Sequence, residues 1–125
     1  MLITKKYSFM STRAQVRFAT REEGVSFSEH PNAIHAQFYV HHDGYPEDLG
    51  VEIAESALYS YKITNWEIDY LDTRRTDLNY IYYVWQHPDK STWISIFDAY
   101  EDKCIFVGEP SNLIDKYKLN TNAYG

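Results

Sequence analysis

The chain contains one cysteine, Cys104, and therefore cannot close a disulfide within itself. The apolar residues after it, Ile105 to Val107, indicate a thiol that packs as a small hydrophobic group and is inert. No apolar run approaches the roughly 20 residues that a membrane-spanning helix needs, and no signal-peptide pattern begins the sequence. We therefore expect a soluble cytoplasmic protein that does not associate with a membrane.

Basic residues are also scarce, with 12 lysines and arginines against 18 acidic residues and a net charge of −6. A protein that binds the phosphate backbone of a nucleic acid needs clustered positive charge, so direct nucleic-acid binding is not expected. The 5 glycines form neither a Walker nor a dinucleotide-binding pattern. The composition predicts no cofactor.

Aromatic side chains, in contrast, are plentiful at 17% of the residues, including 12 tyrosines. Tyrosine combines contact area with a polar tip and is enriched at interfaces. Aromatic residues are also simply typical of β-strands, so both interpretations stay open. Exposed aromatics on antiparallel strands would be consistent with a homodimer.

The length of 125 residues predicts a single domain, 1–125. Alternating apolar and polar residues predict strands, with Val25 to Phe27 continuing the first after a turn. The predicted strands span residues 14–19, 35–41, 66–71, 79–86, 92–97 and 104–107. In the second strand, the even-numbered positions Ala36, Phe38 and Val40 are expected to face the core.

A helix is predicted over about residues 46–60. Pro46 suits a first helical position, and Glu47 and Asp48 suit the positive end of the helix dipole. The apolar positions behind them recur every four residues, as an amphipathic helix requires: Leu49, Ile53, Ala57 and Tyr61. A short second helix is expected to begin at Pro110.

This order of elements predicts an α+β fold, a mainly antiparallel sheet of five to six strands packed by one amphipathic helix, with a short C-terminal helix. Residues 1–9 precede a second Met-Ser-Thr-Arg start at Met10 and are interpreted as an added strand or an N-terminal extension. The tail, 120–125, is expected to fray.

The candidate site is the junction between the second strand and the helix, where a turn at Asp43-Gly44 follows two histidines. In this hypothesis Asp43 and Gly44 shape the turn, and the neighbouring side chains face a ligand or partner. Two arginines of the preceding strand supply positive charge. The complete set is Tyr39, His41, Asp43, Gly44, Tyr45, Arg13 and Arg17.

Three other interpretations of the junction remain open. His35, His41 and Asp43 lie on one strand face and are metal-ligand types, although such a site needs more ligands than the pattern provides, so no metal is predicted. His41 and Asp43 are also a possible acid–base pair for a hydrolase. In the third interpretation, His41 forms a hydrogen bond near the turn and Asp43 caps the helix.

An anion is another candidate ligand, because a helix start presents free N–H groups and a tyrosine can stack on a base. Glu47 and Asp48 oppose this, since both occupy the first helical turn. A small nucleotide therefore remains an alternative to a protein partner.

The Ser-Thr-Arg start at Ser11 and the pattern His41-x-Asp43-Gly44-Tyr45-Pro46 resemble a family of small uncharacterised phage and bacterial proteins. The resemblance covers about residues 10–60. It implies a role in host takeover or in countering host defence. We therefore expect a small acidic non-enzymatic binding protein, an inhibitor of a host defence enzyme or a binder of its nucleotide signal. The alternative is a metal- or His-dependent hydrolase.

Overall fold

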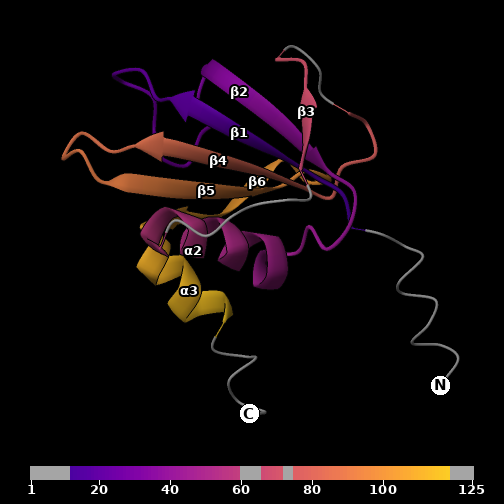
Figure 1. The fold of residues 1–125 in the computed structure, drawn as a ribbon. Helices are drawn as coiled ribbons and strands as arrows, with labels where there is room; N and C mark the ends of the chain where they lie inside the picture. The colour runs from indigo at the N-terminus through magenta and orange to yellow at the C-terminus, as the bar shows by residue number, and fades with distance from the viewer. Residues whose placement is uncertain (1–11, 60–65, 72–74, 119–125) are drawn as a thin grey trace, which may run out of the picture.

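The computed structural model describes residues 12–59, 66–71 and 75–118. The expected N-terminal extension (1–9), the Met10-Ser11 start and the expected frayed tail (120–125) lie outside these residues. The described strands form one six-stranded sheet in the order β3-β2-β1-β4-β5-β6 (Figure 1). Their bounds are β1 Ala14–Thr20, β2 Ala33–Val40, β3 Glu67–Asp69, β4 Tyr80–Gln86, β5 Thr92–Asp98 and β6 Lys103–Gly108.

The sheet is mixed but mainly antiparallel. Its central pair, β1 and β4, is parallel, while all other neighbouring strands are antiparallel. The predicted hairpin between β4 and β5 is present, and the His87 N–H donates to the Ser91 carbonyl at 2.8 Å. The predicted α+β class and the order of its elements are confirmed.

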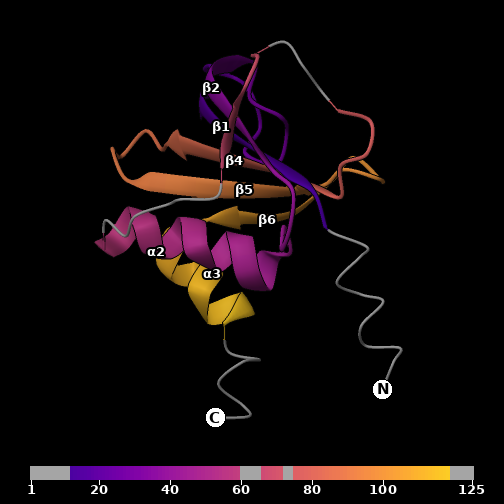
Figure 2. The ribbon, with the colours of Figure 1, turned by 45° about the vertical axis from the view of Figure 1, so that its right-hand side comes forward.

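Both helical segments lie on one face of the sheet, which we call the helix-covered face (Figures 1 and 2). The predicted long helix begins with a π-helical turn, η1 (Pro46–Gly50), and continues as α2 (Val51–Tyr59); α3 spans Pro110–Tyr117. None of the described helices is long and apolar enough to cross a membrane. The core on this face is apolar and includes Val16, Leu49, Ile53, Tyr82, Ile96 and Leu113.

The opposite face is covered by the segments 21–32 and 75–79, and we call it the loop-covered face. Tyr39, Ile81, Tyr83, Trp85 and Phe97 are buried there in a second cluster. The even positions of β2 do face the helices, but the odd positions Gln37 and Tyr39 are also buried, at 1% and 3% exposure. The strand therefore has a buried face on each side, and the predicted core face is only one of them.

Two local predictions are corrected by the structure. Val25 and Ser26 are irregular and Phe27 begins a turn, so no strand continues here; the Val25 N–H donates to the Glu22 carbonyl at 3.2 Å across the preceding turn. The strand predicted over residues 66–71 is reduced to Glu67–Asp69. Trp66 still packs on Phe38, with ring centroids 5.6 Å apart, and it fixes the position of this edge strand.

Candidate functional site

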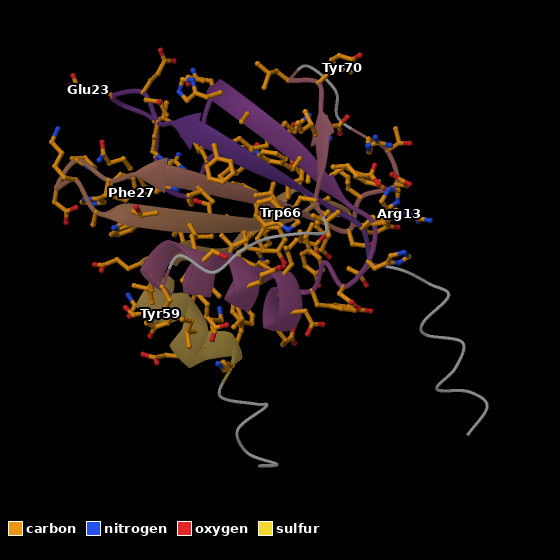
Figure 3. The ribbon with its side chains drawn as sticks, in the orientation of Figure 1. Arg13, Glu23, Phe27, Tyr59, Trp66 and Tyr70 are labelled. Carbon is orange, nitrogen blue, oxygen red and sulfur yellow. The ribbon has the colours of Figure 1, made fainter. Side chains whose placement is uncertain are left out.

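A groove of about 790 Å³ lies where the end of β2, the start of β3 and the segment η1–α2 meet. Its apolar wall is formed by Val40, Leu49, Val51 and Trp66, and Figure 3 shows Trp66 between the sheet and α2. The remaining lining residues are two histidines and six carboxylates: His41, His42, Asp43, Glu47, Asp48, Glu52, Glu55 and Glu67. The groove is therefore concave and strongly acidic.

The turn at one end of the groove depends on Asp43 and Gly44 in different ways. Asp43 has the left-handed backbone conformation, with φ of 59°, a region that aspartate tolerates better than most residues. Gly44 is needed for close approach, since an added Cβ would lie 2.9 Å from the Thr12 carbonyl oxygen. The Tyr82 hydroxyl also donates to the Gly44 carbonyl at 2.6 Å. These contacts fix the turn to β1 and β4.

The interpretation of Asp43 as the cap of the helix is wrong. The N-cap residue is Tyr45, and no side-chain hydrogen bond caps this helix. The Tyr45 carbonyl instead accepts from the Leu49 N–H at 2.8 Å, and Pro46 follows at the first helical position. Asp43 is exposed beside the groove and does not cap the helix.

His41 is paired with Glu67, a residue that the sequence analysis did not include in the site. Its Nε2 lies 2.7 Å from Glu67 Oε2 of β3, and its ring packs edge-on against Tyr39 at 4.5 Å. His35 lies at the other end of β2 and contacts the Thr20 hydroxyl. Within the described residues, no group of three or more His, Cys, Asp and Glu side chains is arranged to hold a metal ion.

Two carboxylates of the groove, Asp48 and Glu52, have a raised pKa. Burial raises the pKa of Asp48, and the neighbouring charges of Asp43 and Glu47 raise it further. Burial also raises the pKa of Glu52, which interaction with the Trp66 indole partly offsets. These shifts indicate negative charge that is held close together and incompletely solvated.

The predicted site residues are divided between the two faces of the sheet. Asp43 and His41 line the groove, Gly44 is buried beneath it, and Tyr45 is exposed with its ring 6.4 Å from that of Tyr80. Tyr39 lies on the loop-covered face, where the Arg75 guanidinium lies 3.8 Å from its ring centroid.

The two arginines of the predicted site do not line the groove. Arg17 Nη1 donates to the Tyr83 hydroxyl at 2.7 Å on the loop-covered face, and Arg17 Nε donates to Gln37. Arg13 pairs with Asp77 at 3.4 Å, on the right of Figure 3. Arg13 nevertheless lies next to the turn, since a Cβ added at Gly44 would be 3.4 Å from the Arg13 carbonyl carbon.

Most of the acidic lining was missed, although the sequence contained a signal for part of it. Asp48, Glu52 and Glu55 recur at helical spacing and therefore share one side of the η1–α2 segment. Trp66 and Glu67 had no such signal, because only the pairing of β3 with β2 brings them to the groove. No protein-family model, curated protein or solved structure matches the chain.

Proposed function

We propose that this protein is a non-enzymatic binding protein whose acidic groove takes a cationic segment of a protein partner. The observation that carries the proposal is the lining itself, which combines six carboxylates with the apolar wall of Trp66, Leu49 and Val51. A lysine or arginine side chain matches both features, because its aliphatic stem packs on apolar surface while its head meets a carboxylate.

The described residues neutralise only part of the charge of the groove. Glu55 pairs with Lys118 at 2.6 Å, and Glu67 pairs with His41. In the described part of the chain, no lysine or arginine forms an ion pair with the remaining four, Asp43, Glu47, Asp48 and Glu52. A cationic partner would relieve their mutual repulsion, and it would also associate faster through electrostatic attraction.

An apolar surface continues from the groove along the outer strands. Trp66 packs on Phe38, whose ring lies 5.9 Å from that of Phe18. Ile68, opposite Phe38 in register, is 87% exposed. A partner segment that carries apolar residues beside its basic ones would cover this surface as well as the groove.

The partner is proposed to be an enzyme of the host cell, with this protein as its stoichiometric inhibitor of phage or mobile-element type. Support for that part comes from the resemblance to small phage and bacterial proteins. A nucleotide signal is the less favoured ligand, because its phosphates would meet the carboxylates of the groove, whereas Arg13 and Arg17 do not line it and have other partners.

The test is affinity capture from the host lysate followed by native mass spectrometry. The bait is used as wild type, as the groove variant Glu47→Lys/Asp48→Lys, and as the matched control Glu101→Lys/Asp115→Lys, whose exposed carboxylates lie outside the groove. The two variants change the net charge equally. We expect one protein at one-to-one stoichiometry with the wild type and the control, and at least a tenfold loss with the groove variant, which corresponds to about 1.4 kcal/mol.

Equal loss with both variants would show a dependence on net charge alone and would contradict the groove as the binding site. A retained nucleotide or metal without a protein partner would contradict the proposal as a whole. Circular dichroism of both variants establishes beforehand that each is folded.

A second candidate function is hydrolysis, favoured by the His41–Glu67 pair, in which a carboxylate orients an imidazole within a groove. In that case the protein would act at sub-stoichiometric amounts on its target. His41→Ala would abolish turnover while the thermal unfolding midpoint changes little. A binder would keep its one-to-one action in the same variant.

A further inference from the structure

Arg21, the residue after β1, has an unusual environment on the loop-covered face. Its guanidinium lies over the Trp85 ring, 4.3 Å from the ring centroid. Its Nη1 donates to the carbonyls of Ser26 and Glu29, at 2.6 and 2.7 Å, and so holds the segment 22–29 in place. Both hydrogens of Nη1 are therefore used.

The edge formed by Nε and Nη2 is not used. Arg21 Nε and Nη2 are both buried, and neither has a hydrogen-bond acceptor in the described residues. These two N–H groups point in the same direction and form the fork that pairs side-on with a carboxylate or phosphate. Burial without an acceptor is unfavourable for a charged donor, and burial lowers the pKa of Arg21. Such a pair of donors requires an explanation.

Arg21 is also one of the residues that line a cavity of about 340 Å³, between the segment 21–27 and the turn that joins β4 to β5. Its aromatic wall is formed by Phe27, Trp85 and His87, and Trp93 packs behind it. Phe27 contacts the rings of Trp85, His87 and Trp93 at centroid distances of 5.2 to 5.5 Å. Its side chain nevertheless remains 39% exposed. In Figure 3 Phe27 lies at the far end of the sheet from Arg13 and well apart from Trp66.

We propose that this cavity is a binding site for a small carboxylic acid with an aromatic or apolar body. The carboxylate accepts both free hydrogen bonds of Arg21, and the body packs against Phe27 and His87. The cavity volume lies at the lower end of the range for small-molecule sites, which suits a ligand of about one ring.

The charge around the cavity selects a carboxylate over a phosphate. Lys90 adds a second positive charge to the lining, while Glu22 and Glu23 contribute two negative charges. A single negative charge can be balanced there, whereas a dianion would face repulsion from both glutamates. Because Arg21 Nε and Nη2 are covered, the ligand enters by displacing part of the segment 22–29, whose side chains are mainly exposed.

The test uses phenylacetate as the probe, with phenylacetamide and phenyl phosphate as matched comparisons. Two-dimensional ¹H–¹⁵N spectra follow the indole N–H signals of the three tryptophans during titration. We expect phenylacetate to shift the signals of Trp85 and Trp93 and to leave that of Trp66 unchanged. We expect phenylacetamide, which lacks the charge, to bind at least about tenfold more weakly.

Arg21→Lys keeps the charge but removes the fork, and should weaken phenylacetate binding by about tenfold. Arg13→Lys, on a surface ion pair, is the matched control and should bind as the wild type does. Absence of any shift at millimolar phenylacetate would overturn the site and assign the free donors to internal water. Equal binding of phenylacetamide, or tighter binding of phenyl phosphate, would overturn the carboxylate assignment; both comparisons use the wild type and do not depend on whether a variant folds.

Discussion

The helix-covered and loop-covered faces of the sheet are both buried, but by side chains of different chemistry. Under the helices the core is a continuous set of apolar residues, of which Ile94, Ile96 and Leu113 have no exposed surface. Under the loops, polar side chains are buried among the aromatic ones, with Gln15 and Ser95 fully covered. One sheet therefore combines two kinds of interior.

Many of the polar groups of the loop-covered face are joined in one connected hydrogen-bond network. Arg17 donates to Gln15, Gln37 and the Tyr83 hydroxyl. The Tyr83 hydroxyl also lies 2.7 Å from His30 Nδ1, and His30 Nε2 lies 2.8 Å from Asp102. The network links β1, β2 and β4 to the segment 21–32 and to the turn before β6.

The difference between the faces is one of geometry as well as chemistry. Apolar burial stabilises in proportion to area and tolerates small changes in position, whereas a buried hydrogen bond requires specific partners at fixed distances. The helix-covered face should therefore dominate the free energy of unfolding. The loop-covered face should fix where the loops lie, and with them the Arg21 cavity.

The largest effect is expected from Leu113→Ala in α3, which removes a fully buried side chain from the helix-covered face. The lost burial and the remaining cavity should lower the free energy of unfolding by about 2–5 kcal/mol. Urea unfolding followed by circular dichroism measures this change. Ile68→Ala, at an 87% exposed position, is the control and should change the stability by less than about 0.5 kcal/mol. Similar losses in both variants would contradict the dominance of the helix-covered core.

An intermediate effect is expected from Arg17→Met, which tests the polar network. Gln15, Gln37 and Tyr83 would each lose a charged donor, and the free energy of unfolding should fall by about 1–3 kcal/mol. A second single variant, Gln37→Leu, removes one of the three acceptors, and the double variant Arg17→Met/Gln37→Leu removes that acceptor together with its donor. Its loss should be smaller than the sum of the two single losses. Strict additivity would show that the two side chains act independently and that the network is not cooperative.

The helix-covered face was predictable because it depends on periodicity. Leu49 and Ile53 recur at helical spacing, and Ala14, Val16, Phe38 and Val40 occupy alternate strand positions. All except Phe38, which packs at the margin, lie in the core cluster. Periodicity follows from the geometry of one element and needs no knowledge of the others.

The loop-covered face was not predictable in the same way. Arg17 and Tyr83 are 66 residues apart, and they meet only because β1 and β4 are parallel neighbours. Alternation predicted Arg17 and Gln37 as polar positions but not that segments without regular structure would bury them. The candidate groove shows the same limit. Its local turn at Asp43-Gly44 was predicted, whereas Trp66 and Glu67, which reach it from a distant part of the sequence, were not.

The smallest effect is expected from acid, through Asp69 at the edge of the loop-covered face. Burial by itself would raise the pKa of this carboxyl, but hydrogen bonds from Arg75 and Gln15 more than offset it and hold the pKa below 3.8. A lowered folded-state pKa contributes stability that is present above the unfolded value and is lost as the pH falls through the folded one. Asp69→Asn removes this contribution and should cost about 1 kcal/mol at pH 7, since Arg75 stays partly solvated.

The gap in stability between wild type and Asp69→Asn should therefore narrow as the pH is lowered from 5 towards 3. Urea unfolding at a series of pH values measures it, and Asp115→Asn, an exposed carboxylate on α3, provides a control expected to show no such gap. A gap that stays constant with pH would mean that Asp69 acts through its shape and hydrogen bonds alone. The ionic part of the loop-covered face would then contribute nothing to folding, and the contrast with the helix-covered face would rest on Arg17 and its neutral partners.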